Sequence, residues 1–100
     1  MDIYEKLYGC IGFQWDEGNA RKIWQKHNVT PAECEQIFFH MPLVATEDTK
    51  HSQKEIRFFV LGRTDMDRRL FAAFTIRKKL IRVISARDMS RKERKEYERL

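Results

Sequence analysis

The sequence predicts a single α+β domain in which helices near the N-terminus cover one face of an antiparallel β-sheet. Apolar residues recur at helical spacing up to about residue 40, and from about residue 55 to residue 86 they alternate with other side chains. A chain of 100 residues can bury one hydrophobic core but is too short for two. We therefore expect residues 1–100 to form one domain that ends in a short basic helix.

Two helices are predicted before residue 30. The first covers residues 3–8 and stops at Gly9, a residue that is free to take a positive φ. The second runs from residue 17 to about residue 27, because Asp16 suits its N-cap and Asn28 suits the left-handed position that stops a helix. The apolar stripes of both helices are interpreted as core packing.

Capping boxes predict the start of two further helices. Thr30 is followed by Glu33 three residues later, with Pro31 in the first turn between them. Ser90 and Glu93 repeat the pattern before "RKERKEYERL" at the C-terminus. We interpret this last helix either as a phosphate-binding surface or as a solvated face.

Strands are predicted in the second half of the chain. "GFQWD" is a short early strand, "LVAT" is typical of an edge strand, and residues 47–53 are typical of a turn. Three longer strands follow over residues 55–61, 69–76 and 80–86, separated by "GRTDMD" and "RKK", which suit hairpin loops. An antiparallel meander is the simplest arrangement of these strands.

Strict alternation assigns the side chains of the meander to two faces. The core face would carry apolar residues only, namely Ile56, Phe58, Val60, Leu70, Ala72, Phe74, Ile81 and Val83. The opposite face would mix arginines with apolar groups, namely Arg57, Phe59, Arg69, Phe71, Ala73, Arg82 and Ile84. This mixture predicts a half-covered binding face, although one β-bulge would change the assignment.

The charge of the chain is unevenly distributed. Residues 1–50 carry five Lys/Arg and eight Asp/Glu, a balance of 5 − 8 = −3, whereas residues 51–100 carry fifteen and seven, a balance of 15 − 7 = +8. A basic half indicates a polyanionic partner, which is either nucleic acid, a membrane surface or an acidic protein. No apolar run is long enough to cross a bilayer, no signal peptide is evident, and the two cysteines lack a CxxC spacing. We therefore expect reduced thiols and a cytoplasmic protein.

Four arginines are the strongest candidates for binding phosphate. Arg57, Arg69, Arg82 and Arg87 come from three predicted strands or their ends, so they can converge on one patch. Guanidinium groups match phosphate oxygens and stabilise the charge of a phosphoryl transition state. The alternative is that each arginine pairs with a carboxylate.

The histidines offer candidates for proton transfer. His27 lies beside Lys26 at a predicted helix end, and is either a packed residue or a group that moves a proton. His51 lies in a polar loop near Asp48 and is interpreted as a hydrogen-bonded surface residue. No spacing of His, Cys, Asp or Glu predicts a metal site, and no cofactor motif is present.

An ordered series of motifs spans most of the chain. It runs through "FQWDEGN" at residues 13–19, "KHNVT" at 26–30, "EIRF" at 55–58, "LGRT" at 61–64, "RRLF" at 68–71 and "IRVISARDMSRKERKEY" at 81–97. This series resembles the BrnT family over residues 13–99. Asn28 departs from the glycine that is common at its position, and residues 1–12 form an N-terminal extension before the usual start of the family.

The resemblance implies a toxin of a type II toxin–antitoxin system with a RelE-like fold. Such a toxin is a ribonuclease that is neutralised by a BrnA-like ribbon-helix-helix antitoxin, and it meets DNA only through the complex with that antitoxin. Carried over by position, the catalytic candidates are His27, Glu55, Arg57, Arg82 and Arg87. The candidates for RNA binding are Lys26, Arg69, Arg91, Lys92, Lys95 and Tyr97.

The mechanism expected from these residues is RNA cleavage without a metal or another cofactor. His27 or Glu55 would take the proton of a ribose 2′-hydroxyl, and the arginines would hold the charge that develops on the attacked phosphate. The alternative is a module that binds nucleic acid or antitoxin without catalysis, which includes a degenerate toxin.

Overall fold

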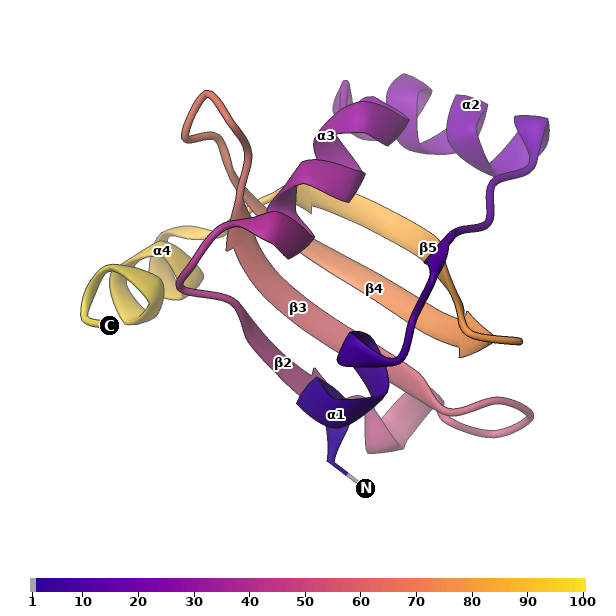
Figure 1. Ribbon diagram of the computed structural model, residues 1–100. Coiled ribbons are helices and arrows are strands. Elements are labelled where there is room, and N and C mark those ends of the chain that lie inside the picture. The colour runs from indigo at the N-terminus through magenta and orange to yellow at the C-terminus, as the bar shows by residue number, and fades with distance from the viewer. Residues whose placement is uncertain (1) are drawn as a thin grey trace.

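A computed structural model describes residues 2–100 and shows one layer of helices packed on a five-stranded sheet (Figure 1). Its elements in chain order are α1 (Ile3–Tyr8), β1 (Gly12–Phe13), α2 (Glu17–His27), α3 (Pro31–Gln36), the 3₁₀ turn η1 (Ile37–Phe39), β2 (Val44–Glu47), the 3₁₀ turn η2 (Thr49–His51), β3 (Arg57–Arg63), β4 (Arg69–Arg77), β5 (Leu80–Asp88) and α4 (Arg91–Glu98). The predicted α+β class is confirmed.

The sheet has the strand order β1-β5-β4-β3-β2. Strands β2 to β5 form the predicted antiparallel meander, with β2 at one edge. The prediction of a purely antiparallel sheet is wrong at the other edge, where β1 pairs in parallel with β5. A parallel pair needs a long connection, and here the chain from α2 to β4 supplies it.

Helices α1, α2 and α3 lie on the viewer's side of the sheet in Figure 1, and α4 lies at one end. The core between sheet and helices is formed by side chains that are less than 10% exposed, among them Ile23, Val29, Cys34, Ile37, Phe58, Val60, Leu70, Phe74 and Val83. The predicted core face is therefore confirmed except at Ile56, which precedes β3 and is 47% exposed.

The predicted helix signals act as expected at four positions. Asp16, Thr30 and Ser90 each accept a hydrogen bond from the backbone of the first helical turn, and the last two complete capping boxes. Asn28 ends α2 with φ 53°, ψ 39°, the left-handed conformation that Asn tolerates. Gly9 is the exception: its φ of −78° is an ordinary helical value, so no positive φ ends α1.

The β4–β5 connection is a two-residue hairpin. Arg77 pairs with Leu80, and both intervening residues, Lys78 and Lys79, have positive φ (51° and 64°), as a type I′ turn requires. The turn places two exposed lysines at the end of the sheet that lies opposite α4 in Figure 1.

A β-bulge in β5 decides which side chains share a face. Ala73 pairs with Ser85 but the next residue of β4, Phe74, pairs with Val83, so Ile84 is an extra residue without a direct partner. Arg82 and Arg87 are five residues apart, and strict alternation would place them on opposite faces. Because the bulge shifts the alternation by one, Arg87 lies opposite Phe71 on the same face as Arg82, and Ala86 turns into the core.

Helix α1 covers the free edge of β2. The backbone N–H of Ala45 donates to the Tyr4 hydroxyl at 2.9 Å, and the Lys6 ammonium lies 5.5 Å from the centre of the Phe58 ring. Both cysteines are free thiols, as predicted, and burial raises the pKa of Cys34 to about 12. Among residues 2–100, no helix is long and apolar enough to cross a membrane.

Candidate active site

The side of the sheet that faces away from α1, α2 and α3, here called the open face, carries all four predicted arginines. The register aligns Arg57, Thr75 and Arg82 in one row across β3, β4 and β5, so Arg57 and Arg82 are two strands, or about 10 Å, apart at Cα. Leu61, Phe71 and Arg87 form another row, two rows and about 13 Å further along the strands. Arg63 and Arg69 form the last row.

A pocket of about 230 Å³ opens beside the first of these rows. Residues from the β2–β3 connection and from three strands line it, namely His51, Gln53, Lys54, Glu55, Arg57, Thr75 and Ile84. The Arg57 guanidinium makes no ion pair with any acid among residues 2–100. The pocket therefore combines an unpaired cation with a histidine and a carboxylate.

His51 is held by a buried aspartate. Its Nδ1 lies 2.7 Å from Oδ2 of Asp48, whose side chain is only 4% exposed, and its backbone N–H donates to Oδ1 of the same group. A carboxylate partner places the imidazole proton on Nδ1, which leaves Nε2 as an acceptor in the neutral ring. The Asp48–His51 pair is thus oriented as a proton-accepting group.

Glu55 lies at the rim of the same pocket and already has a partner. Arg77 donates to its two carboxylate oxygens at 2.7 and 2.6 Å. These hydrogen bonds lower the pKa of Glu55, and the charges of Arg77 and Arg82 lower it further. A carboxylate with a lowered pKa stays ionised at neutral pH but is a weak proton acceptor.

Arg82 reaches past the edge of β5 to Asp16, the N-cap of α2. The pKa of Asp16 is lowered first by the N–H of Asn19 and then by the hydrogen bond from Arg82. Asp16 also accepts the N–H of Asn19, so its role as the N-cap of α2 does not depend on the contact with Arg82.

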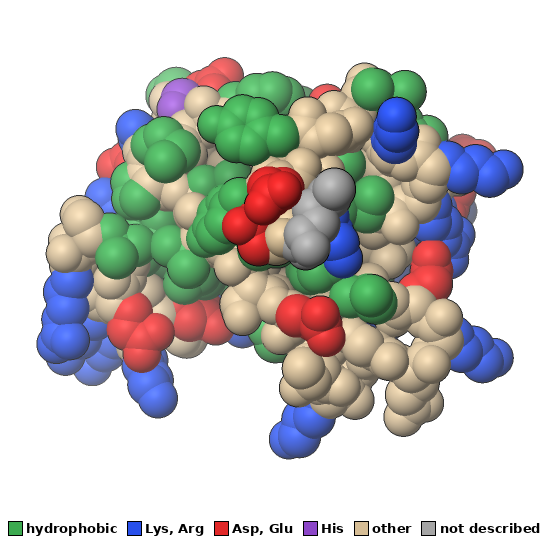
Figure 2. Space-filling model, turned by 60° about the horizontal axis from the view of Figure 1, so that its bottom comes forward, with side chains coloured by type: hydrophobic (Ala, Val, Ile, Leu, Met, Phe, Trp, Pro, Cys, Tyr) green, Lys and Arg blue, Asp and Glu red, His purple; other side chains and the backbone are tan. Residues whose placement is uncertain are grey.

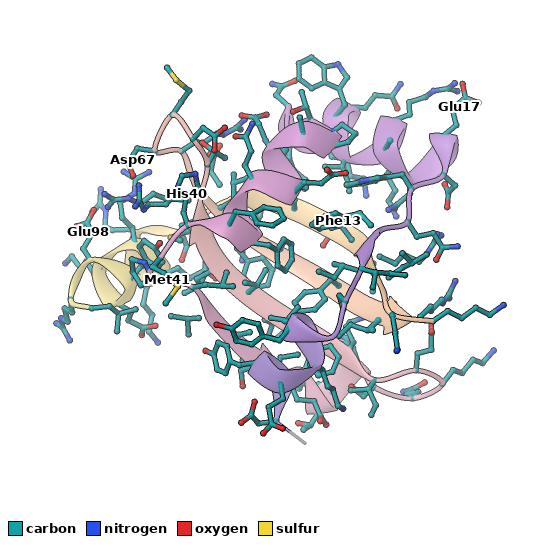
Figure 3. The ribbon with its side chains drawn as sticks, viewed as in Figure 1. Phe13, Glu17, His40, Met41, Asp67 and Glu98 are labelled. Carbon is teal, nitrogen blue, oxygen red and sulfur yellow. The ribbon has the colours of Figure 1, made fainter. Side chains whose placement is uncertain are left out.

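The other two arginines lie at the opposite end of the open face. Arg87 donates to both oxygens of Glu93 (2.8 and 3.0 Å), and Arg69 is flanked by Asp67 and Glu98, which Figure 3 labels at the end that carries α4. Four arginines share a face as predicted, but they form two separate groups and three of them are paired with acids. The alternative of carboxylate pairing is realised for Arg69, Arg82 and Arg87.

His27 and Lys26 end α2 at that second end of the sheet. The charge of His27 contributes to lowering the pKa of Asp88, after the larger contribution of a hydrogen bond from Arg68. Asp88 pairs in register with Leu70, whereas Glu55 bonds Arg77 at the other end of β4, seven residues or roughly 20 Å away. His27 and Glu55 therefore do not belong to one site.

Tyr97 and the cations of α4 differ in accessibility. The Tyr97 ring is 3% exposed, it lies 5.9 Å from the Arg69 guanidinium, and its hydroxyl donates to the carbonyl of Pro42. This corrects the interpretation of Tyr97 as an RNA contact, because a buried ring offers no face for stacking. Arg91, Lys92 and Lys95 are exposed, and Figure 2 shows cationic side chains gathered at the α4 end. With four Lys/Arg and three Glu in α4, its balance is only 4 − 3 = +1.

His51 is a hydrogen-bonded surface residue, as interpreted from the sequence, but it also lines the pocket, which the sequence analysis did not predict. The signal was present, since Asp48 precedes His51 by three residues, and Glu55 and Arg57 follow it in "DTKHSQKEIR". The burial of Asp48, which turns the loop histidine into an oriented group, was not visible in the sequence. Within residues 2–100, no three His, Cys, Asp or Glu side chains are grouped so as to hold a metal ion.

Comparison with known proteins identifies the family of the chain. Residues 15–93 match the family model described as the ribonuclease toxin, BrnT, of type II toxin–antitoxin systems. The chain belongs to the BrnT family. All of β2 to β5 lies inside the match, and so does the pocket, whereas α1 and β1 precede it. A search of curated proteins gave no match.

A solved structure supports the fold. The chain is similar to the 1.1 Å crystal structure of the Brucella abortus ribonuclease toxin BrnT, with a TM-score of 0.58 and 19% sequence identity. The alignment covers 81% of this chain and 99% of the Brucella chain. At this level of identity the likeness concerns the fold alone.

Proposed function

We propose that this chain is a cytoplasmic, RelE-like endoribonuclease toxin that cleaves RNA at the pocket formed by His51, Glu55 and Arg57. Membership of the BrnT family supports ribonuclease chemistry and an antitoxin partner at the level of the family. The observation that carries the choice of site is the unpaired Arg57 guanidinium beside a histidine that a buried carboxylate orients.

His51 is the general base in this proposal. Its Nε2 accepts the proton of a ribose 2′-hydroxyl, and the resulting oxyanion attacks the adjacent phosphorus. The bond from phosphorus to the 5′-oxygen breaks, and that oxygen takes a proton from solvent water as it leaves, which yields a 2′,3′-cyclic phosphate and a 5′-hydroxyl. Asp48 stabilises the imidazolium that forms, as a buried carboxylate partner does in other acid–base sites. No metal ion is required at any step.

Arg57 and Arg82 hold the scissile phosphate. Their Cα atoms are about 10 Å apart in one row, so two long side chains can close on a phosphate between them. Arg82 exchanges its exposed contact with Asp16 for the phosphate. Glu55 keeps Arg77 beside the pocket and is the alternative base, although its pairing with that arginine makes it the weaker candidate.

The second end of the open face binds RNA beyond the cleavage site. Arg69 and Arg87 lie there, next to the exposed Arg91, Lys92 and Lys95 of α4, and Lys26 ends α2 on the helix side of the same end of the sheet. His27 belongs to this region, so its role in the proposal is binding and not proton transfer. The expected consequence is an affinity that falls steeply with salt concentration.

The test uses purified protein, matched RNA and DNA oligonucleotides, and EDTA. RNA is cleaved in the presence of the chelator, whereas DNA binds but survives because it lacks the 2′-hydroxyl. His51→Ala lowers the rate about 10²- to 10⁴-fold, as removal of a general base does. His27→Ala weakens the affinity for RNA and leaves the rate of cleavage of bound RNA unchanged. Arg21→Ala, on the exposed surface of α2, is the matched control and changes neither the affinity nor the rate. Loss of cleavage in EDTA would contradict the metal-independent mechanism. A fully active His51→Ala variant would contradict the assignment of His51 as the general base.

A non-catalytic binding module is the second candidate, and one observation favours it. Three of the four arginines predicted to bind phosphate, Arg69, Arg82 and Arg87, are paired with acids of the same chain, and of these four only Arg57 makes no ion pair among residues 2–100. Such a protein would bind RNA and leave it intact under every condition of the assay above.

The partner in the proposal is a BrnA-like ribbon-helix-helix antitoxin that covers the open face and excludes RNA. Induction of the chain in bacteria should arrest growth, and co-expression of the short neighbouring gene should relieve the arrest. Arg57→Ala, expressed to the same level, should not arrest growth. Arrest by that variant would place the toxic activity elsewhere on the molecule.

A further inference from the structure

Between its two groups of arginines, the open face carries a strip without charged side chains. The row that follows Arg57 aligns Thr46, Phe59, Ala73 and Ser85 across four strands. Phe59 is flanked on β2 by the exposed Thr46 and on β4 by Ala73, and both of these side chains are smaller than the phenyl ring. An aromatic ring in the middle of an open sheet face, bordered by cations, is the arrangement that single-stranded nucleic acids use for stacking.

Phe59 is half-buried and belongs to an aromatic pair. Its centroid lies 5.0 Å from that of Phe71 with 46° between the ring planes, so Phe71 supports it from the side. Phe71 is itself covered, since the Arg87 guanidinium lies 4.2 Å from its centroid. Glu93 in turn holds Arg87 in this position with two hydrogen bonds. The stack from Glu93 to Phe71 thus fixes the orientation of Phe59.

The position of Phe59 relative to the pocket suits a nucleotide next to the cleavage site. Phe59 and Arg57 are two residues apart on β3, on the same face, which separates them by about 7 Å. An unstacked nucleotide whose phosphate is held by Arg57 can therefore lay its base on the neighbouring ring.

We propose that Phe59 is the stacking platform for the base adjacent to the scissile phosphate, and that the substrate is consequently a single-stranded or unpaired stretch of RNA. This inference rests on the proposed ribonuclease site. In an A-form duplex the bases are stacked on one another and the deep groove is closed to side chains, so no base face is free for Phe59. Stacking is tolerant of sequence, which makes Phe59 a positioning residue and not a selector of one base.

The experiment measures binding separately from cleavage. A fluorescent single-stranded oligonucleotide with 2′-methoxy riboses cannot undergo the 2′-hydroxyl attack, and its affinity is read by anisotropy. Phe59→Leu keeps an apolar side chain and removes the aromatic face, and it should weaken binding about 5- to 150-fold. Phe59→Tyr should bind within twofold of the unmodified protein. Leu61→Met, on the same strand and face, is the matched control, and circular dichroism confirms that each variant is folded.

A second series locates the contact. Oligonucleotides that each lack one base are compared for the unmodified protein and for Phe59→Leu. At one position, removal of the base should greatly weaken binding to the unmodified protein. The same removal should not weaken binding to Phe59→Leu any further, because the missing base and the missing ring belong to the same contact. Equal affinity of Phe59→Leu and unmodified protein would overturn the proposal. So would tighter binding of duplex RNA, or a Phe59→Leu variant that loses the antitoxin but keeps RNA.

Failure of the ribonuclease proposal gives a different result. If the protein binds the 2′-methoxy oligonucleotide through Phe59 but leaves ordinary RNA intact, the platform is supported and the cleavage mechanism is not. If neither binding nor cleavage is detected, both proposals are overturned.

Discussion

Arg68 offers the sharpest test of how the helices are fixed to the sheet. It precedes β4 and donates to the backbone carbonyls of Asn28 (2.8 Å) and His27 (3.2 Å) at the end of α2. The same guanidinium bonds the carboxylate of Glu33 in α3 and that of Asp88 at the end of β5. One side chain thus joins two helices to two strands.

Replacement of Arg68 by Met keeps the apolar stem and removes every one of these donors. Hydrogen bonds to charged groups contribute about 1.5–3 kcal/mol each when buried, but Asp88 is 57% exposed and rehydrates in the variant. We expect a loss of about 2–4 kcal/mol in the free energy of unfolding. For a domain of this size that corresponds to a decrease in Tm of roughly 10–30 °C.

The pH dependence of the contribution of Arg68 to stability follows from its partners, the carboxylates of Glu33 and Asp88. Burial alone would raise the pKa of Glu33, but hydrogen bonds from Thr30 and Arg68 lower it, and hydrogen bonds from Arg68 lower the pKa of Asp88. A carboxyl group whose pKa is lowered by folding stabilises the protein above its unfolded pKa of about 4, and this stabilisation is lost as the pH falls through the folded value. The difference in Tm between the unmodified protein and Arg68→Met should therefore shrink between pH 7 and pH 3.

Thermal unfolding at both pH values checks this prediction. Arg21→Met, which removes a single exposed pair with Glu17 at 3.4 Å, is the control and should change the free energy by no more than about 0.5 kcal/mol. An Arg68→Met variant that melts within 3 °C of the unmodified protein, or a difference in Tm that is the same at pH 3, would refute the reasoning.

Three further predictions concern packing and backbone conformation. Gly62→Ala should destabilise the fold by about 1–3 kcal/mol, because its Cβ would lie 2.9 Å from the carbonyl oxygen of Ile37, and chemical denaturation measures the loss. Asn28→Ala should cost about 1 kcal/mol in the same assay, whereas Asn28→Gly should be neutral or stabilising, because the residue has φ 53°. Tyr97→Phe should lower the stability by about 0.5–1.5 kcal/mol through loss of the bond to Pro42, and leave the affinity for RNA unchanged; weaker RNA binding by this variant would restore Tyr97 as an RNA contact.

Local signals in the sequence predicted most of the fold. Both capping boxes, the left-handed Asn28 and a hairpin loop at "RKK" each depend on a few adjacent residues and each forms, although Arg77 belongs to β4 and the loop contains only Lys78 and Lys79. The short strand β1 was predicted within "GFQWD", but its parallel pairing with β5 was not predictable in the same way. Only two residues pair with β5, and their partners come from a segment almost 70 residues away.

The candidate site depends on two features that no local pattern reveals. The bulge at Ile84 is a feature of the register between β4 and β5, and with strict alternation Arg87 would lie on the face opposite to Arg82. The orientation of His51 depends on the burial of Asp48, which the fold imposes on a loop that reads as polar and solvated. The four arginines were selected correctly for their face, but their division into two groups required the register and the positions of the acids.

Comparison of two arginine variants tests the central claim most directly. RNA cleavage in EDTA is measured for Arg57→Ala at the pocket and for Arg69→Gln at the α4 end of the same face, after both variants are shown to be folded. Loss of the guanidinium that stabilises the transition state should lower the rate of Arg57→Ala at least about 100-fold, while Arg69→Gln stays within about tenfold. Full activity of Arg57→Ala, with loss of activity in Arg69→Gln, would place RNA cleavage at the α4 end of the sheet and contradict cleavage at the pocket beside Arg57.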